Sequence, residues 1–500
     1  MAKIFLTLLV FSTLLLPNAI FGQWTQDGQK FVGSTGVKDQ GRSVALSGDG
    51  TTALIGAKNC VLAFIRQGSV WVQQGDSLVG TDAVGNADQG YSVALSEDGN
   101  TALVGGPDDS RQPNTNTNGA VWVFVRNGSS WSQEAKLYGL VPPTDYLGCR
   151  QGVAVSLSGD GNTALVGAPN DFEGGITGSG AGWVFSRTNG TWDAGVKFKG
   201  TGNIGSSNAG ISVCISGDGY TAIIGGNQDD NSKGAAWIFL KDGGGNWVQE
   251  GRKLVGTGSV GRSRQGVSVA MNWAGDVAMV GGDGDNNYKG AVWVYEKDGS
   301  GSWVQKGSKL VATGAVGDVS LGGKVSINGL GNRALIAGLG DNNLAGAAWG
   351  FSKDFQGNWG QDGGKLVGSG NVGQAWQGSG VAINRAGDGG LVSGLRDNLS
   401  QGAVWAWKRD GTVGIDESAV FAGIEAGLKV YPNPTKDLFN VSLDNQPIEN
   451  AEINIYNTLG ELIETTSKSI IDVSQFKNGV YFLRIKTATL QINTHFIVIK

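Results

Sequence analysis

One repeated unit constrains the fold of this chain more than any other feature. It reads most plainly at Gln89 to Asp109, QGYSVALSEDGNTALVGGPDD, where two short apolar runs flank an Asp-Gly-Asn turn. That pattern is typical of two β-strands joined by a hairpin. The turn glycine recurs at 50, 99, 161, 219, 275, 331 and 387, so the last three intervals are each 56 residues. A fixed period of this size predicts a repeat architecture with seven hairpins.

A third and a fourth strand follow each hairpin. The third reads Gly290-Ala-Val-Trp-Val-Tyr295 in one copy, and its Trp and Tyr share one face while the valines line the other. Because both faces are apolar, the strand is predicted to lie in a sheet that is packed on both sides. The fourth strand follows a second turn and reads Trp247 to Gly256 in one copy.

The fourth strand of the last unit is missing after Trp407, but a matching segment, Trp24 to Gly33, stands at the start of the mature chain. If this segment pairs with the last unit, neither end of the array has an open sheet edge. The sequence therefore predicts an all-β chain: a seven-bladed β-propeller of four-stranded blades, closed by an N-terminal strand, and then a small C-terminal β-sandwich.

The repeated residues resemble a known family. Ser-Val-Ala-Leu-Ser, Asp-Gly-Asn-Thr-Ala-Leu-Val-Gly-Ala-Pro at 160 to 169 and Gly-Ala-Val-Trp-Val-Phe are similar to the FG-GAP repeat of integrin-α-type seven-bladed β-propellers. The resemblance covers roughly residues 23 to 412. Calcium-binding loops of that family carry several carboxylates, whereas each turn here has one, too few for a cation that takes 6 to 8 oxygens. Asp49, Asp98, Asp160 and Asp218 are therefore interpreted as turn formers, and no metal or other cofactor is predicted.

The two ends of the chain indicate export. Lys3 and the apolar run from Ile4 to Leu16 are typical of a secretory signal peptide, so residues 1–22 are predicted to be removed, with no transmembrane segment afterwards. After a linker at 413–427, the region 428–500 carries Tyr-Pro-Asn-Pro, Ile-Asp-Val-Ser and Asn-Gly-Val-Tyr-Phe-Leu-Arg-Ile. This set resembles the type A C-terminal sorting domain of type IX secretion substrates. The resemblance implies recognition by the type IX secretion machinery, passage across the outer membrane, removal of the domain, and release or surface attachment. An ordinary small binding sandwich is the alternative.

Composition excludes several classes of function. The net charge is −5 with Lys and Arg scattered singly, so no surface for nucleic acid is indicated. Cys60, Cys149 and Cys214 lack metal-ligand spacing. The one histidine, His495, lies in the region expected to be removed, which disfavours imidazole-dependent catalysis and zinc chemistry. The chain is accordingly predicted not to be an enzyme, although paired carboxylates could still hydrolyse glycosides without histidine.

Two polar positions recur on the face that carries the long loops. One is a glutamine just before the first strand of a blade, and the other is an aspartate in the loop between strands two and three. Both are predicted to form polar rings near the channel and to bind a ligand, with Trp376, Arg150, Tyr146 and Tyr91 adding specificity as irregular residues. Capping of loops or hydrogen bonding between blades is the alternative for both sets. The ligand-binding set is Gln40, Gln89, Gln151, Gln265, Gln377, Asp109, Asp171, Asp229, Asp285, Asp341, Asp397 and Trp376.

Three functions remain open from the sequence. The first is a secreted or cell-surface, non-enzymatic propeller that binds an extracellular glycan or protein, in adhesion or capture. The second is an extracellular carbohydrate-active enzyme that uses loop carboxylates, and the third is a structural surface component. The sequence leaves the ligand, calcium binding and the oligomeric state open.

Overall fold

The computed structural model describes residues 23–110, 118–140, 148–172, 178–354, 356–409, 428–431, 435–443, 446–447, 451–456, 462–486 and 491–498. The predicted signal peptide, the linker, Tyr146 and Pro432 to Pro434 lie outside these residues. The contacts divide the chain into two units, of which Gln23–Asp410 is one and the strands from Leu428 onward belong to the other. Each unit is considered separately below.

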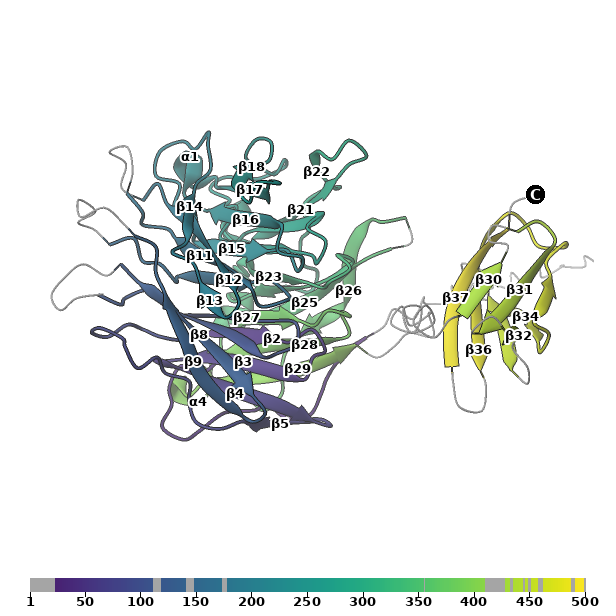
Figure 1. The fold of residues 1–500 in the computed structure, drawn as a ribbon, viewed down its shortest axis with the longest axis horizontal. Coiled ribbons are helices and arrows are strands. Elements are labelled where there is room, and N and C mark those ends of the chain that lie inside the picture. Colours follow the sequence, from purple (N-terminus) through teal and green to yellow (C-terminus); the bar gives the residue numbers. More distant parts are fainter. Residues whose placement is uncertain are drawn as a thin grey trace, which may run out of the picture. The chain divides into compact units, whose positions relative to one another are not determined.

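Within the described residues of the first unit, antiparallel strands form seven sheets (Figure 1). The first three are β2 (Ser43–Leu46), β3 (Thr52–Ala57), β4 (Cys60–Gln67) and β5 (Val70–Gln73); β6 (Ser92–Leu95), β7 (Thr101–Gly106), β8 (Ala120–Asn127) and β9 (Ser130–Leu137); and β10 (Ala154–Leu157), β11 (Thr163–Ala168), β12 (Ala181–Thr188), β13 (Thr191–Trp192) and β14 (Val196–Phe198).

The remaining four sheets have the same strand order. They are β15 (Ser212–Ile215), β16 (Thr221–Gly226), β17 (Ala235–Lys241) and β18 (Trp247–Gln249); β19 (Ser268–Met271), β20 (Val277–Gly282), β21 (Ala291–Lys297) and β22 (Trp303–Gln305); β23 (Leu321–Ile327), β24 (Arg333–Gly338), β25 (Ala347–Lys353) and β26 (Trp359–Leu366); and β27 (Gln377–Ile383), β28 (Gly389–Gly394), β29 (Ala403–Arg409) and β1 (Trp24–Gln26).

The first strands of the sheets contact one another in series. Contacts run from β2 to β6, β10, β15, β19, β23 and β27, and β27 also contacts β2. The labels of β2, β15, β23 and β27 lie near the middle of the unit in Figure 1. Strand β1 pairs antiparallel with β29, opposite Trp407 to Arg409. Six of the sheets have four strands, and the third has five because β13 and β14 both pair with β12. This arrangement is consistent with a propeller-like fold.

The hairpin turns form as their residues dictate. Ser47 Oγ and Thr51 N donate hydrogen bonds to Asp49 Oδ1 at 2.5 and 2.9 Å, and Gly50 supplies a φ of +72°. Burial raises the pKa of Asp49, but the hydrogen bonds and the nearby Arg126 outweigh it and hold that pKa below its usual value. The carboxylate therefore stays charged and closes the turn, which agrees with its interpretation as a turn former.

The third strand of each sheet packs on both faces, as expected from its apolar pattern. Trp293 of β21 is fully buried with Ile223, Ile238 and other residues of the preceding sheet. Val292 and Val294, on the opposite face, belong to the core shared with Trp349 of the following sheet. The core of this unit therefore lies between neighbouring sheets.

The fourth strand is shorter than predicted in several sheets. The segment Trp247 to Gly256 forms only β18, and Leu254 makes a separate bridge to Ala236. Gly251, with a φ of +69°, turns the chain between the two pieces. The N-terminal segment is broken in the same way: β1 ends at Gln26, and Phe31 makes a separate bridge to Val404.

Four short helical turns stand between the second and third strands of the last four sheets. They are α1 (Asp229–Ser232), α2 (Asp285–Tyr288), α3 (Asp341–Leu344) and α4 (Asp397–Ser400). Each contains residues with positive φ, such as Asn286 at +48° and Asn287 at +53°. Their first residues are four of the six repeated aspartates, so these turns position most of one predicted polar set.

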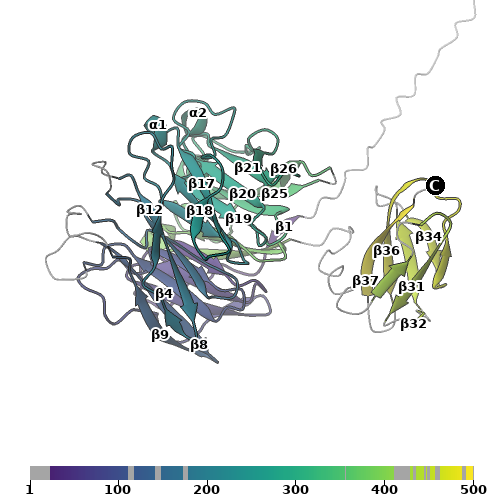
Figure 2. The ribbon, with the colours of Figure 1, turned by 45° about the horizontal axis from the view of Figure 1, so that its top comes forward.

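The second unit forms two small sheets (Figures 1 and 2). One contains β30 (Leu428–Tyr431), β31 (Leu438–Leu443), β32 (Gln446–Pro447) and β35 (Ile470–Asp472), and the other β34 (Leu462–Thr466), β33 (Glu452–Tyr456), β36 (Gly479–Lys486) and β37 (Gln491–Val498). Phe439, Ile453 and Leu483 share one buried core across both sheets, so this unit is a β-sandwich. In the described part of the chain, no helix is long and apolar enough to cross a membrane.

Candidate functional site

The face of the first unit with the long loops carries every residue of the predicted ligand-binding set. Two kinds of loop meet there: the loop between strands two and three, and the segment that leads from one sheet into the next, here called the leading segment. In each sheet, the residue just before the glutamine position has a left-handed backbone conformation with a φ of 55 to 58°. These residues are Asp39, Asp88, Arg150, Asn208, Arg264, Ser320 and Trp376.

The glutamines are buried and satisfied within the protein. Gln89 Oε1 accepts a hydrogen bond from Gly80 N at 2.6 Å, and its Nε2 donates to Gly80 O at 3.0 Å. Gln151, Gln265 and Gln377 make the same pair of bonds to Gly139, Gly256 and Gly368. Gln40 accepts from Gly33 N and donates to Val37 O. Each glutamine thus holds its own leading segment in shape.

The aspartates are also buried, and each forms an ion pair with a lysine. Asp285 is 1% exposed; its Oδ1 accepts a hydrogen bond from Val260 N at 2.7 Å, and its Oδ2 pairs with Lys309. The other pairs are Asp109 with Lys136, Asp171 with Lys197, Asp229 with Lys253, Asp341 with Lys365, and Asp397 with Lys30.

The first sheet lacks both the repeated aspartate and the repeated lysine. Its strands β3 and β4 are joined by Lys58 and Asn59 alone, so no aspartate follows β3. The lysine position of this sheet is occupied by Ser77. Both partners are absent from the same sheet, as expected if the lysine compensates the buried charge of the aspartate. The ligand-binding role of the two polar sets stays a prediction, but their polar atoms are engaged by the fold.

We expect Asp285→Ala to destabilise the protein by about 3–5 kcal/mol, because it leaves the Lys309 ammonium and the Val260 amide without their buried partner. Urea unfolding followed by tryptophan fluorescence measures the change. Asp318→Ala is the matched control: the Asp318–Lys289 pair is exposed and 3.6 Å apart, so its loss should cost about 1 kcal/mol or less. Equal effects of the two substitutions would contradict the structural role.

Two of the irregular residues, Tyr91 and Arg150, lie close together on the loop face. Arg42 Cζ lies 4.2 Å from the centroid of the Tyr91 ring, and Arg150 Cζ lies 6.0 Å from the same centroid. Arg42 Nη1 is 2.7 Å from Asp88 Oδ1, and Arg150 Nη2 is 3.0 Å from Asp108 Oδ1. All five side chains are partly exposed. This Arg–Tyr cluster joins the first, second and third sheets.

Trp376 takes part in a second contact between an arginine and an aromatic ring. Arg396 Cζ is 5.1 Å from its ring centroid, and Arg396 Nη1 is 3.6 Å from Asp39 Oδ1. Its backbone is that of the equivalent residue in every other sheet, so Trp376 is a variable side chain at a repeated left-handed position. Bulky residues seldom adopt this conformation.

Sequence reasoning missed Arg42, Asp88 and Asp108. A signal was present, because the residue after Gln-Gly varies between repeats, from Arg42 to Tyr91 to Val153, while its neighbours recur. A guanidinium carries five N–H donors, and a pair with one carboxylate oxygen uses only part of them. The cluster can therefore donate hydrogen bonds to the oxygens of a ligand. Within the described residues, no group of three or more His, Cys, Asp or Glu side chains is placed to hold a metal ion.

The second unit has a family match. Residues 429–500 match the family described as the secretion system C-terminal sorting domain. No curated protein matches this chain. The FG-GAP resemblance of the first unit stays a prediction. The C-terminal residues thus form a type IX C-terminal sorting domain, which implies interaction with the secretion machinery and indicates export to the cell surface or secretion.

Proposed function

We propose that Gln23–Asp410 is a closed seven-bladed β-propeller related to FG-GAP proteins. The pairing of β1 with β29 supports closure, because it supplies the last sheet with its fourth strand. The contact between β27 and β2 joins the last sheet to the first. Backbone hydrogen bonds from Asp39 N to Ser400 O and from Gln40 N to Gln401 O join the same two sheets on the loop face. All three features bridge residues more than 300 positions apart in the sequence.

The proposed function of this propeller is to bind a glycan or a protein outside the cell, in adhesion or capture. The Arg–Tyr cluster is the observation that carries it. The repeated glutamines and aspartates are buried, bonded within the protein and the same in nearly every sheet. They therefore offer a ligand few specific contacts. Arg42, Tyr91 and Arg150 instead break the repeat, remain partly exposed and combine an aromatic ring with cationic hydrogen-bond donors, and Tyr and Arg are the residue types enriched at binding hot spots.

The function is proposed to be non-enzymatic. Glycoside hydrolysis needs two carboxyl groups that are available to the substrate. The repeated aspartates are each committed to a lysine, and most of them also accept a hydrogen bond from a backbone amide. Asp88 and Asp108 are similarly committed to Arg42 and Arg150. A scaffold of this kind presents a rigid loop surface for recognition.

Binding of the exported protein to glycan arrays and to cell surfaces tests the proposal, with and without calcium. Tyr91→Ala is expected to weaken the observed binding about tenfold or more, since truncation of a central interface tyrosine costs about 2 kcal/mol. Tyr220→Ala is the matched control, because Tyr220 is 60% exposed in the short turn after Asp218 on the opposite face. Blank screens under both conditions, or equal losses in the two variants, would remove support for this site.

A further inference from the structure

One repeated position, in the short turn after the first strand of each sheet, differs sharply between sheets. It is glycine in four of them (Gly48, Gly159, Gly217 and Gly329) and Glu97, Trp273 or Arg385 in the other three. Backbone hydrogen bonds link the seven turns in a circle: Gly48 N donates to Glu97 O at 2.9 Å, and Arg385 N donates to Gly48 O at 3.1 Å. Bonds of 2.9 to 3.2 Å connect the turns between them. These turns are here called the turn ring.

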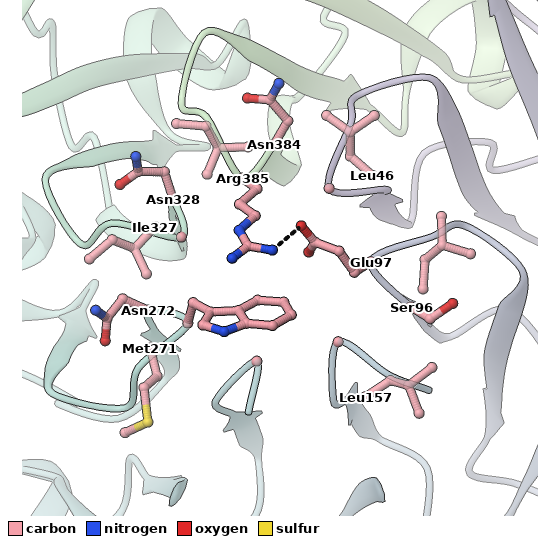
Figure 3. Close-up of a pocket in the computed structure, with 17 residues that line it drawn as sticks. Leu46, Ser96, Glu97, Leu157, Met271, Asn272, Ile327, Asn328, Asn384 and Arg385 are labelled. Carbon is pink, nitrogen blue, oxygen red and sulfur yellow. Dashed lines mark hydrogen bonds and ion pairs between the residues drawn. The ribbon is translucent and has the colours of Figure 1, made fainter. Parts of the chain in front are cut away.

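The three large side chains of the turn ring meet. Arg385 Nη1 lies 3.2 Å from Glu97 Oε1, as the dashed line in Figure 3 marks. Arg385 Cζ is also 4.0 Å from the centroid of the Trp273 ring. The guanidinium therefore bridges a carboxylate from the second sheet and an indole from the fifth. Figure 3 shows Arg385 and Glu97 pointing toward one another inside the circle of turns.

The four glycines leave the room that these side chains occupy. A Cβ atom on Gly48 would lie 2.1 Å from the Glu97 carboxylate. A Cβ on Gly159 or Gly217 would lie 2.1 Å from the Trp273 ring, and one on Gly329 would lie 2.6 Å from Arg385 Cγ. A side chain at any of these four positions would have to displace Glu97, Trp273 or Arg385. The three large side chains therefore occupy the space that the four glycines leave open. The cavity that remains has a volume of about 140 Å³, below the range of sites for small organic ligands.

Two residues of the first strands mark the space behind the turn ring. The Lys324 side chain has exposed surface; desolvation by the surrounding protein lowers its pKa, and the charge of Asp283 acts in the opposite direction. Cys214 also keeps some exposed surface, while burial raises the pKa of its thiol to about 11. Both residues lie on first strands that lead into the turn ring, in β23 and β15 respectively.

We propose that Trp273, Arg385 and Glu97 form a plug that closes the short-turn end of the channel. The channel is then a blind pocket with its mouth on the long-loop face, beside the Arg–Tyr cluster. The inference rests on the closed ring proposed above and deepens it, because a ligand group can then enter the channel only from the loop face.

The thiol of Cys214 reports whether the plug is closed. In the full-length protein, labelling by N-ethylmaleimide at pH 8 is followed by mass spectrometry. The triple variant Glu97→Gly, Trp273→Gly and Arg385→Gly makes all seven positions glycine and should raise the labelling rate of Cys214 about tenfold or more, because reaction of an enclosed group follows its access to solvent. Cys60 and Cys149 are buried thiols, so both should stay unlabelled in a folded variant.

Two controls make the result decisive. Trp192→Gly removes a tryptophan from an outer strand without opening the turn ring, so the Cys214 rate should not change. If Cys60 and Cys149 react in the triple variant, that protein has unfolded, and Trp273→Ala alone, which keeps the Glu97–Arg385 pair, takes its place with the same expected direction. An unchanged Cys214 rate in a folded plug variant overturns the proposal. A ligand screen without hits does not change the labelling expected for Cys214. The proposed binding function and the proposed plug can therefore be contradicted independently.

Discussion

Deletion of residues 23–33 is expected to destabilise the first unit strongly and to make it self-associate. The deletion removes β1 and the Phe31 bridge from the outer edge of β29. It also removes Lys30, the partner of Asp397, which is 1% exposed. Leaving such a buried carboxylate without its cation costs about 3–5 kcal/mol by itself. The open edge of β29 adds a template for pairing with a second molecule.

Urea unfolding and light scattering after size-exclusion chromatography measure the two effects. The expected result is a large fall in the unfolding midpoint together with dimers or higher species. A synthetic peptide of residues 23–33 should restore the midpoint when added in excess, whereas a peptide of the same composition in scrambled order should not. A deletion variant that remains monomeric and has the same urea unfolding midpoint as the parent would show that β1 does not stabilise the last sheet.

The repeat allowed most of the fold to be predicted, because each strand is encoded locally and seven times. The hairpin, its Asp-Gly turn and the two-sided third strand all follow from alternation and turn chemistry within about 20 residues. The break in the fourth strand was not predicted, since a single residue such as Gly251 decides it through its backbone conformation. The strand-like pattern of side chains continues on both sides of that glycine, so the sequence gives no sign of the interruption.

The sequence predicted the repeated polar residues as two sets, but it did not predict their partners. The recurrence of Gln89, Asp285 and their equivalents predicted a place on the loop face, and the structure shows both residues bonded to leading segments. Recurrence alone cannot separate a ligand contact from a structural bond, because both keep the same residue in every unit. The deciding fact is the partner, and Lys309 is 24 residues from Asp285 in the sequence. The informative residues were those that break the repeat, such as Arg42 and Arg385, whose partners lie in other sheets.

Trp293→Ala is expected to destabilise the protein by about 3–5 kcal/mol, because it empties a fully buried site between two sheets. The indole packs with Ile223 and Ile238 of the preceding sheet, and its Nε1 donates a hydrogen bond to Thr257 O at 2.8 Å. The residue that faces the ring, Gly256, has no side chain that could fill the space. The cavity and the unpaired carbonyl therefore add to the loss of buried apolar area.

Trp303→Ala is the matched control for this position. Trp303 belongs to the same sheet but lies on its outer strand, partly buried, where its Nε1 donates to Glu250 Oε2 at 2.6 Å and Lys297 lies 5.5 Å from its ring. Loss of these contacts should cost at most about 2 kcal/mol. Urea unfolding of both variants therefore separates packing between sheets from packing at the rim. If Trp293→Ala unfolds at the same urea concentration as Trp303→Ala, the tryptophan of the third strand does not hold adjacent sheets together. Contacts on the outer strands would then contribute as much to stability as packing between sheets.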